Sequence, residues 1–267
     1  MTSMETASII LAAGRGSRMK DFDGNKALLP LVPRKSAYEG SRPILMEILA
    51  NLPSGPKAVV VNHKKSDVLY ATRDHDITYC EQPELNGTGG GLLAAGSFIE
   101  ECGCSQLIIT MGDVPFVKNA TYKKLVEKLE YKSLVVLGFR PEYKKEYGVL
   151  EIEDDQVRKI TEWKYWKTYP DKRQQTLNIC NSGIYAARKD DLLRYFSVLA
   201  EKPHRVKKNI DGNSFEVEEY FITDIVEYMG DDGLDVGYTI TEDEEEVMGI
   251  DDLQALNRAQ ELFRIRS

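Results

Sequence analysis

The chain has 267 residues, 42% of them hydrophobic, and a formal net charge of −8 from 35 basic and 43 acidic side chains. A chain of this length buries roughly three quarters of its unfolded surface, so its core needs no disulfide or metal for support. The acidic balance argues against a nucleic-acid-binding surface, which carries a basic stripe. No apolar stretch approaches the roughly 20 residues that span a bilayer. We therefore expect a cytoplasmic protein without nucleic-acid or membrane partners, and the polar N-terminus predicts no signal peptide.

The cysteines and histidines do not have the spacing of a zinc site. Cys80, Cys102, Cys104 and Cys180 form no Cys-x-x-Cys pair, and the three histidines are scattered along the chain. Structural zinc sites bring such ligands together at short, regular intervals. We expect buried or idle thiols in a reducing compartment instead.

Strand-like and helix-like segments alternate in the first half of the chain. Strands are predicted at residues 7–13, 58–62, 77–81 and 107–111, and helices at 43–52, 65–74, 89–101 and 120–130. This alternation predicts a mostly parallel sheet with helices on both faces. In such sheets, ligands bind beyond the carboxyl ends of the strands.

After Ser133 the pattern becomes mixed. Strands are predicted at 134–139, 148–153, 157–162 and 177–187, and helices at 216–230 and 251–264. Surface loops are expected at 35–42 and 207–214, and residues 242–246 are expected to form a solvated turn or helix start. This half is expected to form one wall of a substrate cleft.

A glycine- and arginine-rich turn, LAAGRGSRM at residues 11–19, directly follows the first predicted strand. Gly14 and Gly16 have no Cβ, so the backbone can approach a ligand closely and present its N–H groups to phosphate. Arg15, Arg18 and Lys26 supply charge that a triphosphate would need. The turn matches neither the Walker pattern nor the dinucleotide fingerprint. From the turn alone, an ordinary strand-to-loop connection is an equally good interpretation.

Asp113 follows the predicted strand 107–111, within Met-Gly-Asp-Val-Pro. A carboxylate at the rim of the sheet is suited to Mg²⁺, which takes one or two carboxylates together with phosphate oxygens and water. Asp113 could equally cap the next helix or shape the turn that ends at Pro115.

A second glycine-rich stretch runs from Gln82 to Gly91 and leads into an apolar helix. Gly87 and Thr88 are expected near the N-terminus of that helix, where free amides favour a polar ligand edge. Gln82 carries both a donor and an acceptor, as recognition of a base requires. The alternative is a simple N-terminal turn that Thr88 caps.

The order of these motifs resembles that of the sugar-1-phosphate nucleotidyltransferases, and in particular the uridyltransferase domain of the bifunctional enzyme that makes UDP-N-acetylglucosamine. The likeness continues to the C-terminal region through Tyr147-Gly148, Lys159-Ile-Thr-Glu162, Asn181-Ser-Gly183, Tyr220-Phe-Ile-Thr-Asp224 and Glu246-Val-Met-Gly-Ile-Asp251. Together with the earlier motifs they extend the likeness over nearly the whole chain, and this ordered set favours the phosphate-binding interpretation of the first turn.

The resemblance implies a Rossmann-like, three-layer α/β fold with a mixed, mostly parallel sheet, the nucleotide-diphospho-sugar transferase fold. It implies a single domain over 1–267, with a nucleotide-binding half at about 1–131 and a sugar-phosphate-binding half at about 132–267. The sequence stops soon after the predicted helix 251–264, so no left-handed β-helix acetyltransferase domain is expected.

The resemblance also implies roles for individual residues. Arg18, Lys26 and Asp113 would be catalytic, the first two on phosphates, and Mg²⁺ would be held by Asp113 and Asp251. The nucleotide would contact Leu11, Ala12, Ala13, Gly14, Gly16, Gln82, Gly87 and Thr88. The sugar phosphate would contact Gly148, Glu162 and Asn181. On their own, Glu162 would be interpreted as a surface acid and Asn181 as a turn former.

The implied reaction joins a nucleoside triphosphate, with UTP favoured, to a sugar 1-phosphate such as N-acetylglucosamine 1-phosphate or a similar hexose 1-phosphate. The alternative is a cytidylyl- or guanylyltransferase acting on phosphocholine, an alcohol phosphate or the molybdenum cofactor. A nucleotide-binding regulator without activity is a third possibility, but such a protein would be expected to lose its charged catalytic groups.

The sequence departs from the family pattern near the predicted site. The family carries Asn at the position of Asp251, where a carboxylate remains a good ligand for a hard cation. Gly90 replaces a residue that is often His, and residues 32–42 form an apparent insertion after the lysine motif. Neither the sugar nor the oligomeric state follows from these patterns.

Overall fold

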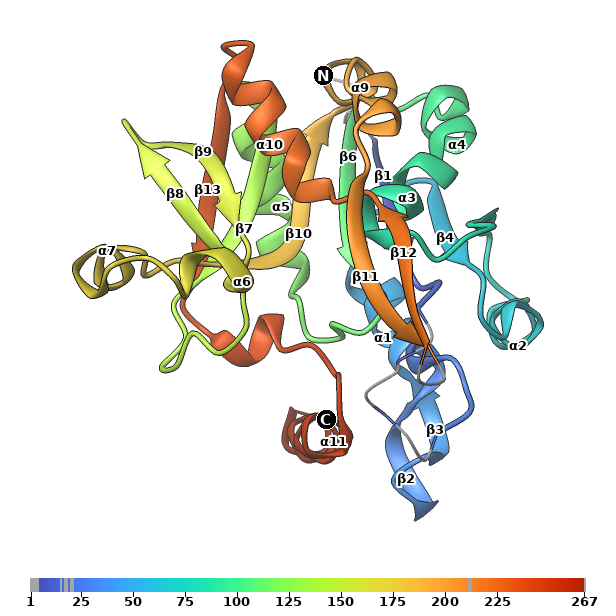
Figure 1. The fold of residues 1–267 in the computed structure, drawn as a ribbon. Helices are drawn as coiled ribbons and strands as arrows, with labels where there is room; N and C mark the ends of the chain where they lie inside the picture. The colour runs from blue at the N-terminus through green and yellow to red at the C-terminus, as the bar shows by residue number, and fades with distance from the viewer. Residues whose placement is uncertain (1–4, 15, 17–18, 20–21, 211–212, 267) are drawn as a thin grey trace.

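The computed structural model describes residues 5–14, 16, 19, 22–210 and 213–266. Within these residues a nine-stranded sheet forms the centre of the molecule (Figure 1), with strand order β13-β7-β10-β6-β1-β4-β5 and with β8 and β9 attached beside β10. The strands of this sheet are β1 (Thr6–Leu11), β4 (Lys57–Val61), β5 (Thr78–Glu81), β6 (Gln106–Met111), β7 (Leu134–Phe139), β8 (Val149–Glu153), β9 (Gln156–Thr161), β10 (Cys180–Arg188) and β13 (Val236–Thr241).

Most neighbouring strands along this path are parallel. β1 pairs in parallel with β4 and β6, β4 with β5, and β7 with β13. β10 is the exception, because it runs antiparallel to both β6 and β7. The predicted mixed, mostly parallel sheet is therefore confirmed.

Helices cover both faces of the sheet. Successive residues of a strand point to opposite faces, so Ile10 enters one apolar cluster and Ile9 the other. The first cluster packs under α1 (Ile44–Asn51), α2 (Lys65–Ala71), α5 (Asn119–Glu127) and α11 (Leu253–Arg266). The second packs under α3 (Gly87–Ala94), α4 (Gly96–Glu101), α8 (Lys189–Leu193), α9 (Phe196–Glu201) and α10 (Ile222–Asp231). The three layers that the sequence predicted are present.

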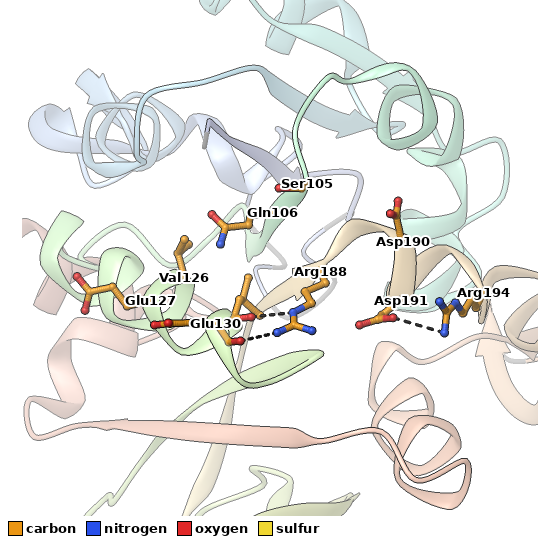
Figure 2. A pocket seen from close by; sticks show the side chains of 10 residues that line it. Ser105, Gln106, Val126, Glu127, Glu130, Arg188, Asp190, Asp191 and Arg194 are labelled. Atoms are coloured by element: carbon orange, nitrogen blue, oxygen red, sulfur yellow. Dashed lines mark hydrogen bonds and ion pairs between the residues drawn. The ribbon is translucent and has the colours of Figure 1, made fainter. Parts of the chain in front are cut away.

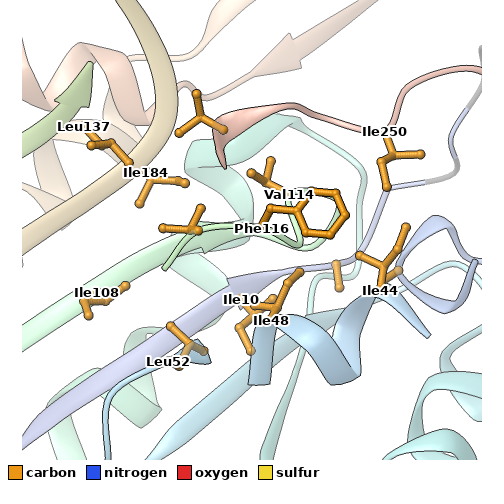
Figure 3. Close-up of a cluster of buried hydrophobic side chains, with 14 of the residues drawn as sticks. Ile10, Ile44, Ile48, Leu52, Ile108, Val114, Phe116, Leu137, Ile184 and Ile250 are labelled. Atoms are coloured by element: carbon orange, nitrogen blue, oxygen red, sulfur yellow. The ribbon is translucent and has the colours of Figure 1, made fainter. Parts of the chain in front are cut away.

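Figure 3 shows the first cluster where β1, β6 and α1 meet. Ile10 of β1 lies beside Ile48 of α1, and Ile108 of β6 and Ile44 of α1 belong to the same buried cluster. Because interiors are close-packed, replacing Ile48 with Ala would cost about 2–5 kcal/mol of folding stability. Ile250 joins the same cluster, so the residue before Asp251 is anchored in the core.

The remaining elements are short helices and two hairpins. The helices are α6 (Trp163–Trp166), α7 (Asp171–Thr176), and the 3₁₀ turns η1 (Lys26–Leu28), η2 (Lys128–Glu130) and η3 (Glu244–Val247). One hairpin joins β2 (Pro30–Ser36) to β3 (Glu39–Pro43), and the other joins β11 (His204–Ile210) to β12 (Asn213–Glu219).

Both hairpins correct the sequence prediction. Residues 35–42 were expected to be a surface loop and instead belong to β2–β3, which packs beside α11 (Figure 1). Gln260 of α11 holds this hairpin by donating from Nε2 to the carbonyl oxygens of Pro30 and Ala37, each at 2.8 Å. The expected loop 207–214 belongs to β11–β12, apart from residues 211–212, which lie outside the described residues.

Three other local predictions were also wrong. The helix expected from residue 216 begins at Ile222, because the residues before it alternate in polarity and extend as β12. The helix expected over 89–101 breaks at Ala95 into α3 and α4. Glu246, expected in a solvated turn, is 2% exposed and accepts hydrogen bonds from the Lys118 amide and the Thr241 hydroxyl.

The expectation of buried thiols agrees with the structure. The four cysteines are buried and free. In the part of the chain that the structure describes, no helix is long and apolar enough to cross a membrane.

Candidate active site

Lys26 lies between two carboxylates that come from distant parts of the chain. Its Nζ donates to Asp113 Oδ2 at 2.6 Å and to Asp251 Oδ1 at 2.8 Å. The lysine side chain is 12% exposed, against 25% for Asp113 and 43% for Asp251. Burial alone would lower the pKa of Lys26, but the two carboxylates outweigh it and the net pKa is raised. The structure therefore brings together three of the residues that the sequence selected.

Asn25, which the sequence analysis missed, fixes the turn that carries Lys26. Its side chain is buried, and both its amide nitrogen and its amide oxygen form hydrogen bonds with the main chain of the site. Nδ2 donates to the carbonyl oxygens of Ala12 and His63, both at 2.9 Å, and Oδ1 accepts from the amide of Ala27. An Asn directly before a short helix is a typical N-cap, and that signal was present in the sequence.

Asp113 is held at the carboxyl end of β6 by main-chain contacts on both sides. The Gly112 amide donates to the Leu11 carbonyl at 2.9 Å, and the Ile250 amide donates to the Asp113 carbonyl at 3.0 Å. A Cβ added at Gly112 would lie 2.9 Å from the Cβ of Ala12, so the ends of β1 and β6 are in close contact here. This packing fixes Asp113 relative to the glycine-rich turn and to Asp251.

The described part of the glycine-rich turn lies beside Lys26. The Ala12 amide donates to Val60 of β4 and the Ala13 carbonyl accepts from His63, while Gly14 is exposed with open space where a Cβ would project. Gly16 has a φ of +64°, and a Cβ there would lie 2.5 Å from Cγ of Lys26. The turn thus packs against the lysine stem, whereas Arg18 lies outside the described residues.

Gln82 and the loop after it follow the carboxyl end of β5. Gln82 is buried, and its Nε2 donates to Asn86 Oδ1 at 2.9 Å and to the Gly87 carbonyl at 3.1 Å. A Cβ added at Gly91 would lie 3.3 Å from both Gln82 Oε1 and Leu11 Cδ2. Gln82 is therefore adjacent to the start of the glycine-rich turn, as expected for one nucleotide site.

The same loop is fixed to the segment between β12 and α10. The Gly89 amide donates to the Tyr220 carbonyl at 2.8 Å, and the Thr88 hydroxyl accepts from the Ile222 amide at 3.3 Å. Gly87 has a φ of +93°, and a Cβ there would lie 2.4 Å from the Tyr220 carbonyl oxygen. Thr88 therefore anchors the start of α10 rather than capping its own helix.

Gly148, Glu162 and Asn181 converge on the other side of the site. The Asn181 amide donates to the Gly148 carbonyl at 2.8 Å, and a Cβ at Gly148 would lie 3.5 Å from Glu162 Oε2. Burial raises the pKa of Glu162. A Cβ at Gly183, two residues beyond Asn181, would lie 3.3 Å from Met111 of β6. This cluster, which we call the acceptor cluster, therefore adjoins the strand end that carries Asp113.

Asn181 is itself held in place by two hydrogen bonds. Its Nδ2 donates to the Tyr185 hydroxyl at 2.9 Å, and its Oδ1 accepts from the Gly183 amide at 3.0 Å. An amide nitrogen has two hydrogens. One of them remains available to a ligand while the side chain stays fixed.

The chemistry of the donors around Lys26 fits a hard divalent cation. Asp113 and Asp251 place oxygens around a single ammonium group, so both can reach one positive centre. Among the residues that the structure describes, no group of three His, Cys, Asp or Glu side chains is arranged to hold a metal. Two carboxylates with the other positions left to phosphate and water is the arrangement that Mg²⁺ prefers.

A hollow of about 880 Å³ lies at the opposite end of β6, near Ser105 and Gln106 (Figure 2). Arg188 lies in this hollow, but its guanidinium donates to the carbonyl oxygens of Leu129 and Glu130 at 2.7 Å. Those carbonyls belong to η2, which continues α5, so Arg188 satisfies the end of a helix. The hollow is separate from the residues around Lys26.

Three features meet at the carboxyl ends of parallel strands: the glycine-rich turn, Lys26 between its two carboxylates, and the loop that begins at Gln82. Together they define an α/β protein of the nucleotidyltransferase class. The chain belongs to the family of the MobA-like NTP transferase domain, whose model matches residues 8–164.

Curated relatives support this assignment. The chain is 34% identical over 260 residues to the bifunctional protein GlmU of Wolbachia sp. subsp. Brugia malayi, an alignment covering 96% of the chain and 57% of that protein. It is 31% identical to the bifunctional protein GlmU of Novosphingobium aromaticivorans, covering 95% of the chain and 52% of that protein. The chain thus spans about half the length of the curated relatives it matches.

A solved structure supports the fold. A candidate UDP-N-acetylglucosamine pyrophosphorylase from Entamoeba histolytica superposes with a TM-score of 0.73 at 15% identity, over 98% of this chain and 82% of that one. The nucleotide-diphospho-sugar transferase fold implied by the sequence is confirmed.

Proposed function

We propose that this chain transfers a nucleotidyl group from a nucleoside triphosphate, with UTP favoured, to a sugar 1-phosphate such as N-acetylglucosamine 1-phosphate or a similar hexose 1-phosphate. The observation that carries the proposal is the contact of Lys26 with both Asp113 and Asp251. The chain just after Asn181 of the acceptor cluster packs against Met111, two residues before Asp113. One side of this centre fits a triphosphate and a base, and the other side fits a second, polar substrate.

In the proposed reaction, a phosphate oxygen of the sugar 1-phosphate attacks the α-phosphorus of the triphosphate. The new P–O bond forms as the bond between the α-phosphorus and its bridging oxygen breaks, and pyrophosphate leaves with that electron pair. The attacking phosphate is already ionised at neutral pH, so no strong general base is needed. The barrier is mainly that of bringing two polyanions together in the right orientation.

The side chains divide this task between them. Lys26, and in our proposal Arg18, bind phosphate oxygens and offset their charge. Asp113 and Asp251 would hold Mg²⁺, which supplies Lewis-acid neutralisation of the phosphates when bound. Glu162 and the free amide hydrogen of Asn181 would bind and orient the sugar phosphate. Gln82, Gly87 and Thr88 would bind the base.

The acceptor and the base can be tested together. We expect pyrophosphate release when the chain is given UTP with a hexose 1-phosphate, in a panel of UTP, dTTP, CTP and GTP against hexose 1-phosphates, phosphocholine and an alcohol phosphate. Release only with CTP or GTP and a non-sugar phosphate would replace the proposal with the alternative of a cytidylyl- or guanylyltransferase. Tight nucleotide binding without release from any acceptor would indicate a nucleotide-binding regulator.

A further inference from the structure

The orientation of the Gln82 amide is determined by its surroundings. Its terminal nitrogen lies 3.1 Å from the carbonyl oxygen of Gly87 and 2.9 Å from Oδ1 of Asn86. A main-chain carbonyl can only accept a hydrogen bond, so the Gln82 atom that faces it must be the Nε2 donor. Both hydrogens of Nε2 are therefore used inside the loop.

Asn86 supplies the second of these acceptors, Oδ1, although its position at the start of α3 would suggest that it caps the helix. It is the N-cap residue of α3, yet its side chain makes no capping hydrogen bond. An N-cap Asn ordinarily accepts from an amide in the first helical turn. Here Oδ1 accepts from Gln82 instead, so this side chain serves the glutamine and not the helix.

Gly90 provides the space that this arrangement needs. A Cβ added at Gly90 would lie 1.7 Å from Asn86 Oδ1 and 3.1 Å from Gln82 Nε2. Any larger residue at this position would displace the Asn86 amide. Asn86 and Gly90 are thus matched to each other, one filling the volume that the other leaves empty.

The remaining polar atom of Gln82 is available to a ligand. Within the described residues, Oε1 has no hydrogen-bond partner, and the one buried polar side-chain atom without a partner is Oγ of Ser8. Oε1 is therefore not sealed in the core. It lies on the side of Gly91 and Leu11, where the glycine-rich turn begins.

We propose that Asn86 determines base specificity by fixing Gln82 so that only its acceptor, Oε1, faces the nucleotide. This rests on the nucleotide site of the proposed function. The site then selects a pyrimidine whose ring N3 carries a hydrogen, as in uracil and thymine. In this proposal Oε1 accepts from ring N3. In cytosine N3 is itself an acceptor, so two lone pairs would face each other at this contact.

The test measures binding of UTP, dTTP and CTP by calorimetry with no acceptor present, so that no turnover is required. UTP and CTP have the same ring size, which isolates the polar edge of the base. We expect UTP and dTTP to bind about 10- to 100-fold more tightly than CTP, the range that an unpaired buried acceptor produces. A difference between UTP and dTTP would report the 5-methyl group separately.

Two variants then address Asn86 itself. Asn86→Ala removes the acceptor, and Gly90→Ala leaves Asn86 in place but displaces its amide. Each is expected to reduce the ratio of UTP to CTP affinity by about fivefold, because Gln82 retains only the Gly87 carbonyl. Asn86→Asp keeps an acceptor and should keep the ratio. Asn62→Ala is the matched control, since Asn62 Nδ2 bonds the main-chain oxygen of Gln82 at 2.7 Å and not its amide.

The outcomes separate this inference from the proposed function. Equal binding of UTP and CTP by the unmodified chain, or an unchanged ratio in both Asn86→Ala and Gly90→Ala, would overturn the role of Asn86. Selective binding without pyrophosphate release from any acceptor would overturn the proposed function and leave the inference standing. Binding of none of the three nucleotides would overturn both.

Discussion

The two sides of the candidate site are built in different ways. On the nucleotide side, the turn after β1 and the loop after β5 are fixed largely by main-chain hydrogen bonds and by glycines in close contact with backbone. On the acceptor side, the functional groups of Glu162 and Asn181 are side chains. Glu162 directly follows β9, and Asn181 lies at the start of β10. The backbone can recognise what is common to all nucleoside triphosphates, whereas side chains can change from one acceptor to another. The comparison explains why the nucleotide class is easier to infer than the sugar.

The centre shared by the two sides gives the largest expected effect. Asp113→Asn keeps the size of the side chain but removes the charge that faces Lys26. Turnover should fall by about 100- to 1000-fold, the scale on which transition-state charge stabilisation is lost. Pyrophosphate release at saturating substrates measures this effect, and circular dichroism should show an unchanged fold. Near-normal turnover would remove Asp113 from the catalytic centre.

The variant Gly87→Ala tests whether main-chain contacts of a glycine hold the nucleotide side of the site. A Cβ at this positive φ would meet the Tyr220 carbonyl oxygen at 2.4 Å, so the loop must move. We expect the Kd for UTP to rise about 30-fold and the KM for the acceptor to change little. Gly103→Ala is the matched control, because nothing lies within 4 Å of a Cβ at that position. Equal losses for both substrates would show that the two sides are not independent.

The acceptor side is tested by Glu162→Gln. This change keeps the shape of the side chain but makes it a weaker acceptor of hydrogen bonds from sugar hydroxyls. The KM for the sugar 1-phosphate should rise about tenfold, the size of one charge-assisted hydrogen bond. The Kd for UTP, measured without acceptor, should be unchanged. A matching loss of UTP affinity would contradict the division between the sides.

A smaller effect is expected for Asp251→Asn. The amide oxygen can still accept from Lys26 and remains a ligand for a hard cation. Turnover should fall by about threefold, with the difference largest at low Mg²⁺ concentration. A loss as large as that of Asp113→Asn would show that this chain depends on both charges.

The smallest expected effect concerns stability and pH. Because burial raises the pKa of Glu162 above its ordinary value of 4.5, the folded state binds this proton more tightly than the unfolded state. The ionised carboxylate therefore destabilises the fold at neutral pH, and the penalty disappears as pH falls below the ordinary value. Glu162→Gln should raise the Tm by about 2 °C at pH 7 and by less at pH 4. A lower Tm at pH 7 would contradict this sign.

The sequence predicted the central sheet because its strands are continuous apolar runs between helix-like segments, as in Leu107–Ile109. It failed at β12, where a helix was predicted from residue 216 although Phe215 and Val217 alternate with glutamates at the period of two that is typical of a strand. It also failed for Glu246, whose partners lie on α5 and β13, too far along the chain for a local pattern to reveal.

The site residues were predicted from motif order. Of these, the structure places Asp113, Asp251 and Gly16 next to Lys26. Asn25 was missed although its N-cap position was visible, because its contacts with Ala12 and His63 join segments that no local pattern connects. The identity of the acceptor stays outside the reach of sequence. It depends on the shape of a wall built from side chains, where a methyl-sized difference is worth only about 1–3 kcal/mol.

The hydrogen bonds of Gln260 have a consequence for synthesis of the protein on the ribosome. They join α11 to a hairpin whose first strand begins 230 residues earlier in the chain. The contact between Lys26 and Asp251 likewise joins residues 225 positions apart. The nascent chain can pair β1 with β4 long before either contact exists. It cannot yet place the Asp251 carboxylate beside Lys26. Contacts so distant in sequence form late and slowly. Competence to bind triphosphate in the final geometry should therefore arise only after Asp251 and α11 have left the exit tunnel.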